Sequence, residues 1–262
     1  MNTLKKIILN SFRYFGYNIK KLQKEEKNFL NFDEIYKRIL KKNKITIFDV
    51  GANRGQSINR FLKIFPNAEI HCFEPIKNNF LFLKENFKNR NITLNNFALG
   101  EKNEVKRFYI NAKSSTSSFN KLTKNTGWLK LRSKENNKKM NSFTVETKKI
   151  IVNSLDYYCK KNNIKKIDIL KIDTQGFEDK ILLGSKKSLN NSIISIVELE
   201  MIFDNVYKKY STFTDIEKNL LKNNYRFAGI ETCNNNLFEG VLFFGDLIYI
   251  KKDIIKKHLR NN

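Results

Sequence analysis

Two short apolar runs, the first with Asp49 at its end and the second followed by Glu74, constrain the fold of this chain more than any other feature. The first covers residues 45–50 and continues into the segment Asp49-Val50-Gly51-Ala52-Asn53-Arg54-Gly55. The second covers residues 69–73 and is followed directly by Glu74. A buried strand, a glycine turn, a helix and a second strand in this order form a βαβ unit, which binds its ligand at the carboxyl ends of its strands. The sequence therefore predicts an α/β fold built on a parallel sheet.

The turn after the first run indicates the kind of ligand. Its glycines let the backbone turn sharply and approach a ligand closely, and the helix that follows offers free N–H groups to a carboxylate. Glu74 is placed to accept hydrogen bonds from two ribose hydroxyls. The spacing is G-x-x-x-G rather than the G-x-G-x-x-G that brings backbone against a pyrophosphate, so a dinucleotide fits less well.

We interpret this pattern as a site for S-adenosylmethionine. The simpler alternative is a glycine turn without a ligand, in which Glu74 only caps a helix. The sulfonium of that cofactor is positively charged, and acids near it are favourable in a partly desolvated pocket. The residues expected to bind it are Asp49, Gly51, Ala52, Asn53, Gly55, Glu74, Pro75, Asn96 and Ala98.

Short apolar strands alternate with amphipathic helices along most of the chain. The expected strands cover residues 45–50, 69–73, 92–96, 104–110, 144–152, 167–172, 193–199, 225–230, 237–244 and 247–250. The expected helices cover residues 3–22, 31–42, 55–65, 77–88, 154–162, 177–183 and 214–223. No helix separates the last strands, which indicates an antiparallel edge. We therefore expect a basic helical appendage over 1–44, a main domain over 45–251 and a basic tail over 252–262.

The alternation lapses between residues 101 and 152, where a polar insertion rich in Ser, Lys and Asn includes residues 114–118. A long polar insertion in a compact domain is typical of a substrate lid or of a mobile loop. We favour a lid.

Acids also follow the later strands, and the carboxyl ends of parallel strands meet at one edge of the sheet. Asp173 and Glu198 are therefore expected near Asp49 and Glu74. Lys171 shares a strand face with Asp173, and a buried lysine needs an acidic partner, which is either Asp173 or Glu198. We take Asp173, Lys171 and Glu198 as the catalytic candidates, although a purely structural ion pair explains Lys171 equally well. Asp173 is the first candidate for a general base and Glu198 the second. The two carboxylates could also bridge a divalent ion to the acceptor, but no metal is predicted.

Six motifs occur in order between about residues 45 and 250. They are Phe48-Asp49-Val50-Gly51-Ala52-Asn53-Arg54-Gly55, Phe73-Glu74-Pro75, Ala98-Leu99-Gly100, Ser154-Leu155-Asp156, Leu170-Lys171-Ile172-Asp173-Thr174-Gln175-Gly176-Phe177-Glu178 and Val197-Glu198. Together they resemble the FkbM family of S-adenosylmethionine-dependent methyltransferases. Gln175 stands where many relatives carry Glu, so an acidic or metal-binding role is not carried over to this position.

The resemblance implies a class I methyltransferase fold. This is a Rossmann-like α/β architecture with a mostly parallel seven-stranded sheet, an antiparallel last strand and helices on both faces. It also implies O-methylation, commonly of sugars in surface glycans or of secondary metabolites. We therefore expect a methyltransferase that acts on the hydroxyl of a sugar, in surface glycan biosynthesis.

The chain carries 50 Lys and Arg against 26 Asp and Glu, a net charge of +24. The excess is concentrated in residues 1–44 and 113–139. Such a surface attracts an acidic substrate, a nucleic acid or an anionic lipid, and biased lysine usage explains it equally well. Apolar residues recur at helical spacing in residues 1–22, which predicts a helix that lies on an anionic membrane or packs on its own domain.

The cysteine spacing and the hydropathy both agree with a cytoplasmic protein. The three cysteines form no C-x-x-C pair, and no run of ~18 apolar residues occurs. We expect a cytoplasmic protein, either free or peripheral at the inner membrane surface.

The acceptor is expected to be a saccharide or another hydroxylated molecule. Amino-methylating enzymes of DNA use a motif with adjacent prolines, and cytosine C5 enzymes use a Pro-Cys pair. The two prolines of this chain, Pro66 and Pro75, are not adjacent, and neither is followed by a cysteine. We therefore expect no DNA partner. Two alternatives remain, namely an RNA ribose methyltransferase and a non-catalytic surface-binding protein with a vestigial cofactor fold.

Overall fold

The computed structural model describes residues 31–42, 44–88, 91–232 and 242–259. The chain divides into two compact units, residues 1–31 and 32–262. The helix expected over 3–22 lies outside the described residues. Helix α2 (Phe32–Ile39), which the sequence analysis assigned to the appendage, belongs instead to the second unit, where Phe32 and Tyr36 are buried in the core.

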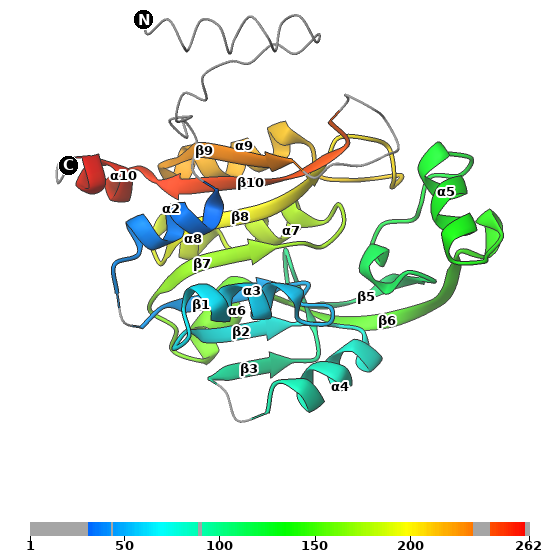
Figure 1. Cartoon of the computed structure of the whole chain (residues 1–262), viewed down its shortest axis with the longest axis horizontal. Coiled ribbons are helices and arrows are strands. Elements are labelled where there is room, and N and C mark those ends of the chain that lie inside the picture. The colour runs from blue at the N-terminus through cyan, green and yellow to red at the C-terminus, as the bar shows by residue number, and fades with distance from the viewer. Residues whose placement is uncertain (1–30, 43, 89–90, 233–241, 260–262) are drawn as a thin grey trace, which may run out of the picture. The chain divides into compact units, whose positions relative to one another are not determined.

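A seven-stranded sheet runs through the second unit in the order β3-β2-β1-β7-β8-β10-β9 (Figure 1). These strands are β3 (Ile92–Asn95), β2 (Glu69–Phe73), β1 (Thr46–Val50), β7 (Ile167–Ile172), β8 (Ile194–Ile202), β10 (Phe244–Lys251) and β9 (Tyr225–Thr232). Neighbouring strands from β3 to β8 are parallel, and β10 is antiparallel to β8 and β9. The expected mostly parallel sheet with an antiparallel last strand is confirmed.

Helices cover both faces of this sheet (Figure 1). One face packs against α2, α3 (Gln56–Ile64), α4 (Lys77–Asn86) and α10 (Lys252–Leu259). The other packs against α6 (Leu155–Lys161), α7 (Glu178–Leu183), α8 (Lys186–Asn190) and α9 (Phe213–Leu220). Because side chains alternate between faces, Ile47 joins the first core and Phe48 the second. Strands buried on both faces read as continuous apolar runs, which is why β1, β2 and β7 were recognisable in the sequence.

The insertion forms a second sheet of three strands in the order β4-β6-β5. These are β4 (Ala98–Gly100), β6 (Thr144–Ser154) and β5 (Glu104–Asn111). Between β5 and β6 lie the 3₁₀ turns η1 (Ser114–Thr116) and η2 (Met140–Ser142) and the helix α5 (Gly127–Glu135). Both strands expected in this region are confirmed, but α5 was not expected.

Two elements near the end of the chain differ from expectation. β10 is one strand where two runs were expected at 237–244 and 247–250, and residues 237–241 lie outside the described part. β8 continues to Ile202, beyond the expected end at residue 199. Within the described ranges, every helix is too short or too polar to cross a bilayer.

Candidate active site

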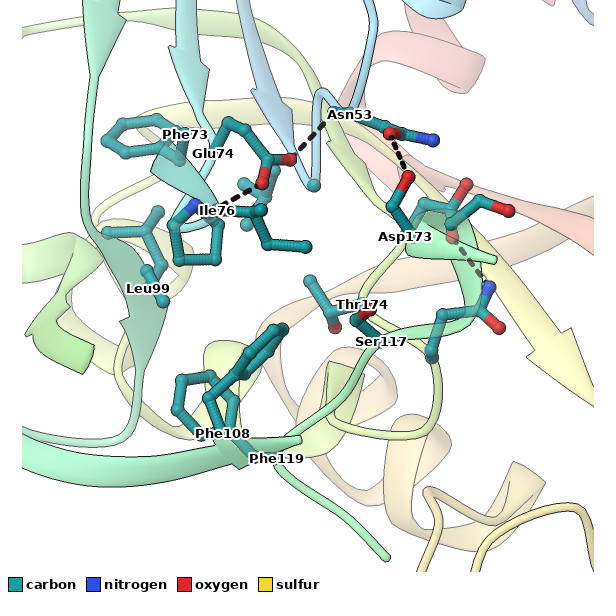
Figure 2. Close-up of a pocket in the computed structure, with 17 residues that line it drawn as sticks. Asn53, Phe73, Glu74, Ile76, Leu99, Phe108, Ser117, Phe119, Asp173 and Thr174 are labelled. Atoms are coloured by element: carbon teal, nitrogen blue, oxygen red, sulfur yellow. Dashed lines mark hydrogen bonds between the residues drawn. The ribbon is translucent and has the colours of Figure 1, made fainter. Parts of the chain in front are cut away.

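A crevice lies beside the carboxyl ends of β1 and β2, and we call it the cofactor crevice. The predicted cofactor-binding residues that line it are Gly51, Asn53, Glu74, Pro75 and Ala98. The loop after β7 adds Asp173, Thr174 and Gln175. The insertion adds Phe108, Ser114, Ser115, Ser117 and Phe119 (Figure 2). Residues from three separate parts of the chain thus surround one space at the edge of the sheet where a ligand was expected.

Glu74 lines this crevice with its carboxylate between two backbone N–H groups (Figure 2). The N–H of Asn53 donates to Oε2 at 2.9 Å, and the N–H of Ile76 donates to Oε1 at 2.7 Å. Burial raises the pKa of Glu74 to about 7, although these hydrogen bonds favour the charged form. Each carboxylate oxygen has a second lone pair, so the anchored group can still accept bonds from two hydroxyls.

Gly51 is required by the geometry of the turn. Its φ is +89°, and a Cβ atom here would lie 2.0 Å from the backbone oxygen of Asp173. Only glycine therefore lets the β1 turn lie directly against the loop after β7. Gly55 has φ +85°, but its Cβ atom would meet the ring of Phe87 at 2.4 Å. Packing against α4 thus explains Gly55, which does not line the crevice.

The other predicted cofactor-binding residues support the crevice from behind. Asn96 donates from Nδ2 to the backbone oxygens of Glu74 at 2.9 Å and Pro75 at 3.3 Å. Ala52 and Asp49 are buried. Both carboxylate oxygens of Asp49 lack a hydrogen-bond partner among the described residues, and burial raises its pKa to about 6. Asp49 does not line the crevice, and the positive charge of Lys171 favours its ionised form.

The crevice is narrow in this structure. Its cavity volume is about 50 Å³, room for only a few water molecules at ~10–15 Å³ each. A nucleoside therefore enters only if part of the wall moves outward. The insertion is linked to the turn after β1 by a 3.4 Å hydrogen bond from Ser114 Oγ to Asn53 Oδ1, which is long for a hydroxyl donor. The lid role of the insertion stays a prediction that this geometry supports.

Asp173 is held in place by two neighbours. Lys171 Nζ lies 3.3 Å from its Oδ2, and Gln175 Nε2 donates to its Oδ1 at 3.0 Å. Burial alone lowers the pKa of Lys171, but Asp173 and Asp49 outweigh that effect and raise it above its ordinary value. Of the two partners expected for Lys171, the structure therefore selects Asp173.

Glu198 is not at a strand end, so the prediction that it lies there was wrong. Because β8 continues to Ile202, Glu198 is in mid-strand and fully buried. Its carboxylate accepts hydrogen bonds from Arg60, at 2.5 Å, and from Tyr36. It lines neither of the two cavities that contain Asp173.

Glu200, two residues further along β8, occupies the place expected for Glu198. Gln175 Nε2 donates to its Oε2 as well as to Asp173. Burial, together with Asp173 and Asp246, raises the pKa of Glu200 well above its usual value. The sequence signal for this residue was the alternation in Glu198-Leu199-Glu200, which places both acids on one strand face.

A second cavity of about 180 Å³ adjoins the first, and we call it the acceptor pocket. It shares Ser115, Asp173 and Gln175 with the cofactor crevice. Its remaining lining consists of Lys113, Thr116, Trp128, Arg132, Glu200, Ile202, Phe243 and Phe244. Within the described part of the chain, no group of three or more His, Cys, Asp or Glu is placed to hold a metal ion.

The strand order, the single antiparallel strand and the crevice at Gly51 and Glu74 define a class I methyltransferase fold. Residues 49–227 match the family model for the methyltransferase FkbM domain. The chain therefore belongs to the FkbM family of methyltransferases. The resemblance seen in the sequence is confirmed, and with it S-adenosylmethionine as the cofactor.

Several known proteins are similar to this chain. The 2-O-methyltransferase NoeI of Sinorhizobium fredii (strain NBRC 101917 / NGR234) is 26% identical over 167 residues, which cover 59% of this chain and 63% of NoeI. The chain thus spans less than two thirds of the length of this relative. The structure of the methyltransferase FkbM of Methylobacillus flagellatus KT matches with a TM-score of 0.49 and 15% sequence identity. The match covers 79% of this chain and 44% of the FkbM chain. The structure of the magnesium protoporphyrin IX methyltransferase of Synechocystis PCC 6803, solved with bound S-adenosylmethionine, matches with a TM-score of 0.45 and 11% sequence identity. The match covers 96% of this chain and 98% of that enzyme's chain.

Proposed function

We propose that the protein methylates a hydroxyl group of a sugar during surface glycan biosynthesis. The observation that carries the proposal is the position of Asp173, which lines the cofactor crevice and the acceptor pocket together. A carboxylate at the junction of a donor site and an acceptor site is within reach of the hydroxyl that reacts. It can take the hydroxyl proton as the new O–C bond forms, which typically contributes ~10²–10⁴-fold to the rate.

Each residue of the crevice has a separate part in this reaction. Bound S-adenosylmethionine supplies an activated methyl group. Glu74 is suited to hold its ribose, and the turn at Gly51 and Asn53 to hold its amino-acid end. Lys171 and Gln175 fix the orientation of Asp173, so that little rearrangement is needed when the acceptor binds.

The choice of a sugar acceptor rests on the relative and on the acceptor pocket. NoeI is named a 2-O-methyltransferase. The pocket combines the ring of Trp128 with the polar groups of Asp173, Gln175 and Glu200. Sugars have apolar ring faces and hydroxyl edges, and a pocket with an aromatic wall and a few polar groups suits both.

The test compares surface polysaccharide from a deletion strain with that from the parent. We expect the deletion to remove the mass of one methylene per acceptor sugar, and the purified protein with S-adenosylmethionine to restore it in vitro. Protein carrying Asp173→Asn serves as the matched control and should restore little. Polysaccharide of unchanged mass in the deletion strain would refute the glycan role.

RNA ribose methylation is the second candidate because of the net charge of +24. Under this alternative, an electrophoretic assay should detect RNA binding that weakens steeply with salt. Binding of S-adenosylhomocysteine in a calorimeter would argue against the non-catalytic alternative. A cytoplasmic location, with residues 1–22 against an anionic membrane, stays a prediction.

A further inference from the structure

The two sides of the acceptor pocket carry different ionisable groups. The sheet side holds the carboxyl groups of Asp173 and Glu200, and the insertion side holds the cationic groups of Lys113 and Arg132. The cavity of about 180 Å³ is more than ten times the ~10–15 Å³ that one water needs, so it has room for a small polar molecule. A pocket with this polarity orients a molecule that has a negative group at one end.

Arg132 contacts neighbouring side chains at the insertion side. It lies in α5, whose first turn is capped by Thr126 through a 3.1 Å hydrogen bond from the N–H of Leu129. Its Nη1 donates to Glu135 at 2.7 Å, and its guanidinium lies 6.0 Å from the ring centre of Trp128. Only 22% of its side chain is exposed. Such a partly buried, oriented guanidinium binds an anion more strongly than a free surface charge does, because less motion is lost and water screens it less.

The sheet side disfavours an anion. The cations that line the pocket, Lys113 and Arg132, both come from the insertion, and on the sheet side Lys171 is already paired with Asp173 through a 3.3 Å contact. The hydroxyl of an acceptor, in contrast, is a proton donor and suits the carboxylate of Asp173. The two ends of the pocket therefore select two different groups of one molecule.

We propose that the acceptor is an anionic sugar whose carboxylate or phosphate is bound by Arg132, with Lys113 nearby, while its reacting hydroxyl faces Asp173. This inference rests on the proposed sugar methylation and adds the charge of the acceptor and its direction in the pocket. The exposed Lys113 adds attraction that salt screens, and Arg132 provides the paired hydrogen bonds that fit a carboxylate or a phosphate.

Trp128 is the single tryptophan of the chain and lines this pocket, so its fluorescence reports on binding directly. The full-length protein is saturated with S-adenosylhomocysteine and titrated with methyl glucuronoside, glucose 6-phosphate and methyl glucoside. We expect at least one anionic probe to bind ~10-fold more tightly than the neutral one, the ratio typical of a charge-assisted hydrogen bond. Comparing the carboxylate probe with the phosphate probe distinguishes the two sources of charge.

Four variants test whether Arg132 carries this preference. Arg132→Gln should bring the anionic and neutral probes within ~2-fold of each other, and Arg132→Lys should restore part of the difference. Glu135→Gln removes the ion pair but leaves the guanidinium, and should keep the preference. Arg107→Gln makes the same charge change at an exposed position of β5 outside the pocket, and should also keep it.

Equal affinities for all three probes, or a preference that survives Arg132→Gln, would overturn the inference. So would the absence of any saturable signal from the anionic probes. These results are distinct from a failure of the proposed function, in which S-adenosylhomocysteine itself does not bind or no glycan loses a methyl group in the deletion strain.

Discussion

The cofactor crevice and the acceptor pocket share Asp173 but are built in different ways. The crevice depends on backbone contacts: the N–H groups of Asn53 and Ile76 hold Glu74, and Gly51 lies against the backbone of Asp173. The acceptor pocket depends on side chains from segments far apart in the sequence, such as Arg132, Glu200 and Phe243. A site made by backbone turns leaves a local motif, whereas a site made by converging side chains leaves none.

This contrast predicts separable defects. Changes in the crevice should weaken cofactor binding, changes in the acceptor pocket should alter acceptor binding, and only the shared residues should lower turnover with both ligands bound. The variants below test that separation.

The largest effect is expected at the shared carboxylate. Asp173→Asn keeps the size of the side chain but removes its capacity to take a proton, so turnover should fall ~10²–10⁴-fold. Affinity for S-adenosylhomocysteine, measured by calorimetry, should change little. Asp179→Asn is the control, because Asp179 lies on α7 outside both cavities and is bonded to Ser211 and Lys180. Turnover within a few-fold of wild type in Asp173→Asn would show that another group is the base.

Glu198→Gln should affect stability and leave the chemistry intact. Glu198 forms a buried ion pair with Arg60, and removing the charge leaves the guanidinium without its main partner. We expect a loss of about 3 kcal/mol in the free energy of unfolding, measured with denaturant. Turnover per folded molecule should stay near wild type, because Glu198 lines neither cavity that contains Asp173. A loss of turnover per folded molecule would restore Glu198 as a candidate for the general base.

Glu200 lies in the site where Glu198 was expected, and this difference illustrates what the sequence can and cannot predict. The strands β2 and β7 were predicted to the residue, because strands buried on both faces appear as unbroken apolar runs. The end of β8 was not predictable, because its pairing with β10 continues through Glu200 opposite Asp246, and these charged residues resemble a loop. The length of β8 is set by its pairing with β10, far along the chain, and the acid that lies in the site is therefore Glu200 rather than Glu198.

Helix α5 was missed for a related reason. The segment Gly127–Glu135 begins with glycine, and its apolar side chains Trp128, Leu129 and Leu131 all lie in its first half, so no amphipathic pattern runs through it. The helix is stabilised instead by the burial of Trp128 and Leu129 in a cluster with Phe143 and Tyr207. Arg132 could not be placed in a pocket without knowing that α5 exists.

Gly51→Ala tests how far the crevice depends on backbone geometry. The added methyl would lie 2.0 Å from the backbone oxygen of Asp173 at a φ of +89°, so both steric overlap and strain oppose it. We expect a loss of about 2–4 kcal/mol in the free energy of unfolding, together with weaker binding of S-adenosylhomocysteine. Gly127→Ala is the matched control, because nothing lies within 4 Å of the added methyl at the start of α5, and it should be neutral or slightly stabilising. Equal stability of the two variants would contradict the tight approach of the two loops.

The smallest and most specific effect is expected at Glu74. Its pKa of about 7 means that the carboxyl is largely protonated at pH 6, while two ribose hydroxyls require the ionised form as acceptor. Binding then releases a proton, so the affinity for S-adenosylhomocysteine should fall toward ~10-fold per pH unit below pH 7 and be flat above it. Glu74→Gln should weaken binding by about 1–3 kcal/mol at pH 8 and remove this pH dependence.

Glu69→Gln at the start of the same strand is the control for this last test, since Glu69 pairs with Lys44 at the surface and lies outside the crevice. It should leave both the affinity and its pH dependence unchanged. If Glu74→Gln binds as tightly as wild type at pH 8, the ribose is held elsewhere. If its affinity is lower but still falls below pH 7, the titrating group is a different acid of the site, and Asp49, with a pKa of about 6, is the next candidate. Either result would show that the local motif predicts the position of the crevice but does not identify the residue that binds the cofactor.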